Sequence, residues 1–328
     1  MTSTVERAEI HRPEGWRRRL ALSPDLVDFA NRGFRTDRPA TRAVLERAAG
    51  AFLDGYNRGL DTPYGHPTDL DGIAVELRGF AAEGSAMAAV LLDRLSPRRH
   101  GRFAAQLGGH PRHDYLLHVG AGWALAKLDD VTAGTLGRLG RLGEQNGLLR
   151  WLAYDGYGFF KVFFSRDPTL GRWRRHRKPC DPTCAIRYQG LGRCLWFRES
   201  GDPTAVAERV AGLPASHRGD VWSGIGLAAT YAGGVDPDAH LLLRRLAGNH
   251  RTALAQGAAF AAEARRADGT AGGTVDATTR ILTGVSAETA AEWTWQARHG
   301  LDRPGAGPAD YGEWRTRIQR LAASHVAG

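Results

Sequence analysis

Lysine and cysteine are scarce in this chain of 328 residues. Lysine occurs only at Lys127, Lys161 and Lys178, so arginine supplies almost all of the positive charge behind a formal net charge of +9. Alanine and glycine are abundant, with 42 glycines. Arginine used in place of lysine, together with this composition, is typical of a GC-rich bacterial genome, such as that of an actinobacterium.

The 3 cysteines offer no standard zinc-ligand set. Cys180 and Cys184 are separated by three residues that include Pro182, a spacing unlike that of the common zinc sites. His176 could complete a set of four ligands, but Cys194 falls on a segment predicted to be a buried helix. The sequence therefore predicts no metal site, and it leaves open whether the thiols stay reduced or form a disulfide.

Long apolar runs are also lacking. No stretch reaches the roughly 18 consecutive apolar residues of a membrane-spanning helix. The first nineteen residues are polar and basic, without the apolar segment of a secretory leader. We expect a cytoplasmic protein with no membrane span.

The familiar catalytic signatures are missing as well. The chain has no phosphate-binding loop, no dinucleotide fingerprint, no Gly-x-Ser-x-Gly elbow and no His-Glu-x-x-His motif. Neither zinc-finger spacing nor an RNA-recognition motif accompanies the basic charge, so no nucleic-acid partner is expected. Motifs therefore name neither a reaction nor a cofactor.

A glycine-centred segment recurs along the chain. Six copies can be aligned on a glycine that follows another small residue by two positions, and the steps between these anchors are 38, 36, 34, 34 and 31 residues. A near-constant period of this size indicates a repeat architecture. A seventh, degenerate copy occurs at 52–57. The anchors are Gly84, Gly122, Gly158, Gly192, Gly226 and Gly257.

Each repeat is predicted to hold a buried glycine-rich helix and a more polar outer helix. Asp202-Pro203 and Asp236-Pro237 are helix-start signals, each followed by an amphipathic segment that ends in glycine. Local propensity also allows a strand over 156–164, but the alanine-rich sister copies favour a helix. We expect an all-α fold of about seven helix pairs, a tetratricopeptide-like α-solenoid or an α/α toroid.

The predicted domain organisation is simple. Residues 1–21 would form a polar N-terminal arm, and residues 22–328 a single helical repeat domain with a basic loop at the seam over 166–187. The loop is the candidate partner surface, for a synthase or an acyl carrier protein, although an exposed arginine-rich loop also needs no function. The residues predicted for partner binding are Arg172, Arg174, Arg175, Arg177 and Lys178.

Polar side chains on the glycine-rich helices need partners, because an unpaired polar group is costly to bury. They either bond between adjacent repeats or line an interior pocket together with the rings that precede the glycines. For the second alternative, the predicted ligand-binding residues are Tyr154, Tyr188, Gln189, Trp222 and Gln256. The candidate acid–base or metal-ligating residues are Asp155, Glu83 and His118.

The ordered motifs resemble those of the UnbL-like family, a bacterial domain of unknown function encoded with enediyne polyketide synthases. The resemblance covers about residues 22–318. The family would show a polar run where Phe160-Lys161-Val162-Phe163 stands and an aspartate where Tyr188 stands. These departures imply a divergent copy or a partner subunit with a binding role. The matching segments are 78–84, 118–124, 151–159, 189–197, 220–228 and 255–261.

The resemblance implies a role beside the conversion of a linear polyene into an enediyne core. We expect an accessory protein that binds or processes an apolar polyene intermediate in its glycine-rich interior. The alternatives are an enzyme acting on that intermediate, oxidative and dependent on a cofactor or metal, and a scaffold for the synthase or carrier protein. A homodimer, or a heterodimer with a paralogue, fits each of these roles.

Overall fold

The computed structural model describes residues 10–96, 101–128, 147–165, 167–175 and 180–326. Within these ranges the regular structure is entirely helical, with 14 α-helices and several short 3-10 turns. The expectation of an all-α fold is confirmed. The segment 156–164, for which a strand was the alternative, belongs to a helix.

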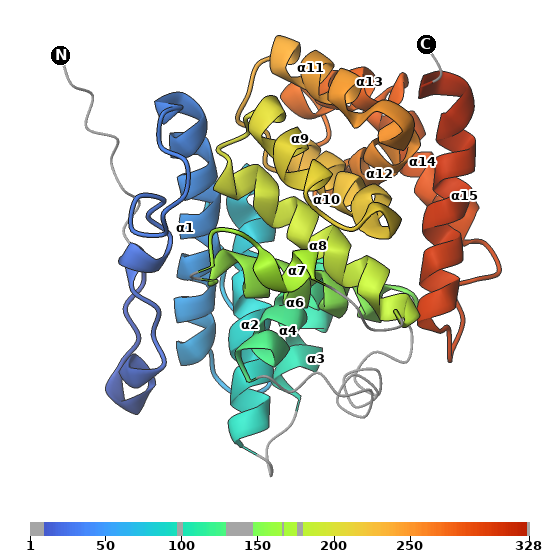
Figure 1. Ribbon diagram of the computed structural model, residues 1–328. Coiled ribbons are helices and arrows are strands. Elements are labelled where there is room, and N and C mark those ends of the chain that lie inside the picture. The colour runs from blue at the N-terminus through green and yellow to red at the C-terminus, as the bar shows by residue number, and fades with distance from the viewer. Residues whose placement is uncertain (1–9, 97–100, 129–146, 166, 176–179, 327–328) are drawn as a thin grey trace.

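Seven glycine- and alanine-rich helices form the centre of the molecule (Figure 1). Each packs along the next in chain order, and these six pairings are the most extensive between helices. The helices are α1 (Pro39–Asp61), α2 (Arg78–Leu95), α4 (Asp114–Lys127), α6 (Leu152–Phe163), α8 (Pro182–Arg198), α10 (Arg218–Tyr231) and α12 (Arg251–Ala267).

The other seven α-helices of the described residues pack around this series, and all but α15 have 12 residues or fewer. Asp202 and Asp236 accept backbone hydrogen bonds at the starts of α9 and α11, which confirms both predicted helix starts. Helix α11 packs between α9 and α13, and α14 and α15 pack on α12. These helices are α3 (Arg102–Gly109), α7 (Gly171–Arg174), α9 (Pro203–Ala211), α11 (Pro237–Ala247), α13 (Thr274–Thr283), α14 (Ala287–Arg298) and α15 (Pro308–Val326).

Glycine lets each central helix approach two neighbours closely. A Cβ added to Gly192 would stand 2.0 Å from the carbonyl oxygen of Val221 in the next helix, and one on Gly190 would stand 1.9 Å from that of Asp155 in the preceding helix. No side chain fits at such distances. A glycine inside a helix costs backbone entropy, up to about 1 kcal/mol for each residue, and the close packing is possible only at that cost.

The packing corrects the repeat alignment at the second helix. A Cβ on Gly84 would meet the carbonyl oxygen of Phe52 in the preceding helix, at 1.9 Å. Gly84 is therefore equivalent to Gly190, two residues before the anchor, and Ala86 occupies the anchor position of α2. The sequence alignment on Gly84 was wrong by two residues because both positions take small side chains.

The last repeat is corrected in the same way. A Cβ on Gly257 would stand 1.8 Å from the carbonyl oxygen of Ser223 in the preceding helix, so the anchor position of α12 is occupied by Ala259. In α1, the degenerate copy, Gly55 faces the next helix and serves as the anchor. The steps between anchors become 31, 36, 36, 34, 34 and 33 residues. The structural anchors are Gly55, Ala86, Gly122, Gly158, Gly192, Gly226 and Ala259.

The early and late helices of the series also meet each other. The ring of Phe80 in α2 packs edge-on against Tyr231 of α10, with centroids 5.1 Å apart. The ring centroids of Tyr115 in α4 and Phe260 in α12 are 6.4 Å apart. The guanidinium of Arg265 donates to the carbonyl of Glu76. The series of helices is therefore curled, so that α2 and α4 meet α10 and α12.

One predicted boundary changes. The loop predicted over 166–187 contains the short helix α7, and α8 already begins at Pro182, where Asp181 accepts a hydrogen bond from the Thr183 backbone amide. The described part of the predicted arm, residues 10–21, lies along α1. There the backbone amide of His11 donates to Asp54.

None of the helices in the described part of the chain combines the length and the apolar character that a membrane crossing requires.

Candidate functional site

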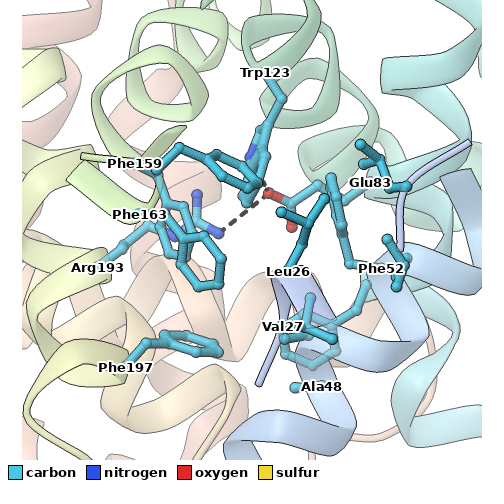
Figure 2. A pocket seen from close by; sticks show the side chains of 15 residues that line it. Leu26, Val27, Ala48, Phe52, Glu83, Trp123, Phe159, Phe163, Arg193 and Phe197 are labelled. Atoms are coloured by element: carbon cyan, nitrogen blue, oxygen red, sulfur yellow. Dashed lines mark hydrogen bonds and ion pairs between the residues drawn. The ribbon is translucent and has the colours of Figure 1, made fainter. Parts of the chain in front are cut away.

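An aromatic cavity lies between the N-terminal segment 22–27 and helices α1, α2, α4, α6 and α8 (Figure 2). Its unfilled space is about 490 Å³, counting the part that opens to solvent. Mostly apolar cavities that carry a few polar groups are typical ligand sites. Its lining residues are Leu22, Leu26, Val27, Ala48, Ala49, Phe52, Leu53, Phe80, Glu83, Trp123, Phe159, Phe163, Phe164, Arg193 and Phe197.

The Trp123 indole is the centre of the aromatic wall. Its centroid lies 4.2 Å from that of Phe52 and 4.9 Å from that of Phe159, both with tilted rings, and 6.0 Å from that of Phe163. These rings come from α4, α1 and α6. Aromatic faces held this close present flat, polarisable surfaces to any molecule that enters between them and the N-terminal segment.

Glu83 and Arg193 are the two charged side chains among the lining residues, and each is at most 5 % exposed. The Trp123 indole N–H donates to Glu83 Oε1 at 2.8 Å. Arg193 Nη2 lies 3.6 Å from the same oxygen, while Arg193 Nη1 donates to Asp155 Oδ1 at 2.5 Å. One buried guanidinium is thus shared between two buried carboxyl groups.

Of the two carboxyl groups, Glu83 has the longer and therefore weaker contact with the Arg193 guanidinium. Burial raises the pKa of Glu83 to about 7; Arg193 opposes the rise and the nearby Asp155 adds to it. Burial lowers the pKa of Arg193, but the two carboxyl groups outweigh it, so that pKa is raised and the guanidinium stays charged. Glu83 therefore exchanges its proton near neutral pH at the wall of an apolar cavity, a property common in acid–base groups.

From Asp155 onward, buried polar side chains of consecutive helices are linked by hydrogen bonds. Gln189 Nε2 donates to Asp155 Oδ2 at 2.8 Å, and the Ser223 hydroxyl lies 3.4 Å from Gln189 Oε1 and 2.8 Å from Gln256 Oε1. The four side chains occupy the same position, three residues before the structural anchor, in consecutive central helices. Glu83 takes this position in α2. The prediction of hydrogen bonds between adjacent repeats is confirmed.

Helix α15 makes further hydrogen bonds to these buried side chains. The Tyr311 hydroxyl lies 3.2 Å from Gln189 Nε2, and Arg315 Nε donates to Gln256 Oε1 at 3.3 Å. Arg315 also pairs with Asp220 through Nη2 at 3.0 Å. The C-terminal helix is therefore attached to the centre by polar contacts as well as by apolar packing.

The rings predicted to bind a ligand lie elsewhere. Tyr154 stacks on Trp151 at 5.9 Å, Tyr188 stacks on His217 at 4.1 Å, and Trp222 is buried; none of the three lines the cavity. Their role in ligand binding stays a prediction.

The three candidate acid–base residues separate in space. Glu83 lines the cavity and Asp155 lies directly behind Arg193. His118 is apart from both: its ring bonds to the Asp114 backbone carbonyl at 2.9 Å and meets Phe103 edge-on at 5.9 Å. The structure thus brings together Glu83 and Asp155, through Arg193, and leaves His118 apart.

Three of the five predicted partner-binding residues, Arg172, Arg174 and Arg175, are exposed in or next to α7. Arg177 and Lys178, and also His176, lie outside the described residues. None of the cysteines, all within the described chain, forms a disulfide. Over the described ranges, no group of three His, Cys, Asp or Glu side chains is arranged to hold a metal ion.

Sequence reasoning missed Trp123, Phe159 and Arg193 as cavity residues. Each follows a structural anchor by one residue, in α4, α6 and α8 respectively. An arginine inside a helix that is otherwise small and apolar was the available signal, because a buried arginine requires an acidic partner. No comparable feature of the sequence indicated that Leu22, Leu26 and Val27 line the cavity.

The fold and site define an all-α protein whose glycine-packed helices enclose a buried ion-pair cluster, Glu83, Arg193 and Asp155, beside an aromatic cavity. The chain belongs to the family described as "Protein of unknown function (DUF1702)", whose family model matches residues 14–322. No curated protein and no solved structure matches it. The family match carries no activity, and the UnbL-like resemblance with its enediyne context stays a prediction.

Proposed function

We propose that the cavity binds an elongated, apolar and unsaturated molecule whose polar end lies at Glu83 and Arg193. The observation that supports this most is the pair itself: a carboxyl with a raised pKa and a guanidinium, both buried, at the wall of an otherwise apolar cavity. Two such groups have no structural need to face unfilled space. They could donate to and accept from a polar group of a bound molecule.

The residues that line the cavity support a flat guest. Its wall is made of the closely spaced rings around Trp123, and its other side is the half-buried Leu22, Leu26 and Val27. A conjugated polyene is apolar, rigid and planar, and stacks well on aromatic faces. Together with the UnbL-like resemblance, this favours an accessory protein of enediyne or polyene polyketide biosynthesis that holds the polyene intermediate.

Native mass spectrometry of the protein purified from its producing strain tests this proposal. We expect a co-purified small molecule with the absorption bands of a polyene, and its loss on Ala48→Trp, which would fill the cavity from α1. Ala43→Trp is the matched control, because Ala43 is on the same helix and does not line the cavity. A guest retained by Ala48→Trp would place the binding site elsewhere, with the rings of Tyr154, Tyr188 and Trp222 as the alternative site.

An enzyme acting on the same molecule is the second candidate, because Glu83 exchanges a proton near neutral pH. Glu83→Gln keeps an acceptor for Trp123 and removes the acid–base function. An enzyme would lose turnover with the guest still bound, whereas a binding protein would change only in affinity. Elemental analysis and a visible spectrum would identify any metal or cofactor.

The third candidate is a scaffold whose exposed arginines on α7 bind an acidic synthase domain or acyl carrier protein. Neutralising Arg172, Arg174 and Arg175 would then abolish pull-down of that partner. In each case the frame we propose is a curled helical-repeat array in the cytoplasm, either a solenoid or a closed toroid. The curled series of central helices supports it.

A further inference from the structure

A cysteine from one place in the sequence meets a histidine and an aspartate from another beside α8. Cys180 Sγ lies 3.0 Å from Nε2 of His217, and Nδ1 of His217 lies 2.9 Å from Oδ2 of Asp220. Cys180 precedes α8, His217 ends the 3-10 turn before α10, and Asp220 is in the first turn of α10. This is the order of contacts that nucleophile, base and orienting carboxylate require.

The histidine is held in one orientation. Its ring stacks on Tyr188 with centroids 4.1 Å apart and an interplanar angle of 7°, and it is 6 % exposed. Asp220 is fixed by Arg315, whose Nη2 lies 3.0 Å from Oδ1. With Nδ1 protonated towards this carboxylate, Nε2 is an acceptor that faces the thiol. Cys180 itself is exposed and can be reached from solvent.

We infer that Cys180 is a nucleophilic cysteine that accepts an acyl group from a thioester or activated ester, with His217 as its base and Asp220 as a positioning residue. In the first step Sγ attacks the acyl carbon, and the thiol proton passes to Nε2. The bond from that carbon to the leaving sulfur or oxygen breaks, and the leaving group takes the proton or departs as the anion. The product is a thioester on Cys180.

The surroundings favour acyl transfer over a disulfide with the neighbouring Cys184. Cys184 is buried and its thiol hydrogen-bonds with that of Cys180. Burial, with this bond, raises the pKa of the Cys184 thiol to about 11, so Cys184 stays protonated. Asp181 and Arg187 are the charged neighbours of this pair on α8 and at its start. An electrophile that arrives from solvent therefore meets Cys180 first.

The adjacent surface indicates the charge of the donor. Trp173 of α7 packs edge-on against Tyr188 at 5.2 Å, and the Tyr188 hydroxyl donates to the Trp173 carbonyl at 2.8 Å. Helix α7 with its exposed arginines thus lies next to the ring that supports His217. A thioester on an anionic carrier fits this surface better than a neutral ester does.

The test uses two probes on the full-length protein, p-nitrophenyl acetate and the anionic thioester acetyl-coenzyme A. We expect one acetyl group on Cys180 in intact and peptide mass spectra, with a burst of p-nitrophenolate. Cys180→Ala removes the adduct and Cys184→Ala keeps it. His217→Ala slows acylation by about 100-fold, the low end of general base catalysis, and added imidazole restores part of the rate.

Asp220 acts through His217, so its variants need a conservative comparison. Asp220→Asn slows acylation and Asp220→Glu, which keeps a carboxylate, restores part of it, while thermal unfolding shows that both fold. Neutralising Arg172 and Arg174 slows transfer from acetyl-coenzyme A and leaves that from p-nitrophenyl acetate unchanged. This site is separate from the aromatic cavity, because none of Cys180, His217 and Asp220 lines it.

Three results would overturn the inference. One is acetyl incorporation on Cys184 or on lysine instead of Cys180. Another is an acylation rate that His217→Ala leaves at the wild-type value. The third is a Cys180–Cys184 disulfide that forms on purification in air while neither probe acylates the reduced protein.

Discussion

Gly190 of α8 lies directly against the backbone carbonyl of Asp155 in α6, so closely that a Cβ would stand 1.9 Å from the oxygen. The same approach brings Gln189, the neighbour of that glycine, within 2.8 Å of the Asp155 carboxylate. Close backbone packing and the buried polar chain therefore have one cause. Glycine at this position permits both.

Gly190→Ala is expected to destabilise the protein severely. The added methyl group meets a carbonyl oxygen of a rigid helix, so α6 and α8 must separate, at a cost of about 3 kcal/mol in the free energy of unfolding, the upper end of the usual range for overpacking. Gly312→Ala in α15 is the matched control, since its Cβ would meet nothing within 4 Å. It should stabilise the protein by up to about 1 kcal/mol, through helix propensity. Equal urea midpoints for the two variants would contradict this account of the packing.

Removing Arg193 leaves two buried carboxyl groups without their shared cation. Arg193→Leu should lower the free energy of unfolding by about 3–5 kcal/mol. Adding Asp155→Asn and Glu83→Gln to it should recover much of the loss, because no charge then stays buried. Arg320→Leu is the control: Arg320 pairs with Glu313 at an exposed site and its loss should cost less than about 0.5 kcal/mol. Urea denaturation measures all four proteins, and a triple variant no more stable than Arg193→Leu would argue against the shared pairing.

The pH dependence of stability gives a signed test of Glu83. Its folded pKa, about 7, exceeds the unfolded value, so between the two the folded state holds a proton that the unfolded state has lost. Stability from this group is therefore present at low pH and lost as pH rises to about 7. Glu83→Gln has no such loss.

The free energy of unfolding of Glu83→Gln, minus that of the wild-type protein, should therefore increase by about 3 kcal/mol between pH 4.5 and pH 8. Urea titrations at a series of pH values measure it. Parallel stability curves for the two proteins would show that the pKa of Glu83 is not raised in the fold.

Much of the fold could be predicted from the sequence because glycine at a repeated spacing has one physical use in a helix, the close approach of another backbone. The identity of the anchor could not be predicted in α2 and α12. There Ala86 and Ala259 occupy the anchor, and the glycine before each was aligned in its place. A small residue at both positions satisfies the packing, and only the contacts distinguish them.

The candidate site was predicted less well. Glu83 and Asp155 could be selected because buried carboxyl groups need partners. Arg193, the partner of both, was passed over as part of a glycine motif. The pairing of His217 with Cys180 could not be predicted either, because 37 residues separate them. Histidine also occupies the equivalent repeat position before α4 and α12, at His113 and His250, so His217 did not stand out.

The most direct test of the central claim, that the cavity binds an elongated unsaturated molecule, is a fluorescence titration with cis-parinaric acid, a conjugated tetraene. The account predicts saturable binding with energy transfer from Trp123 that Trp123→Phe reduces. It also predicts that Ala48→Trp weakens binding at least about tenfold, or 1.4 kcal/mol, while Ala43→Trp leaves it unchanged. Binding that is equally strong in both alanine variants, or no binding by the wild-type protein, would contradict the claim.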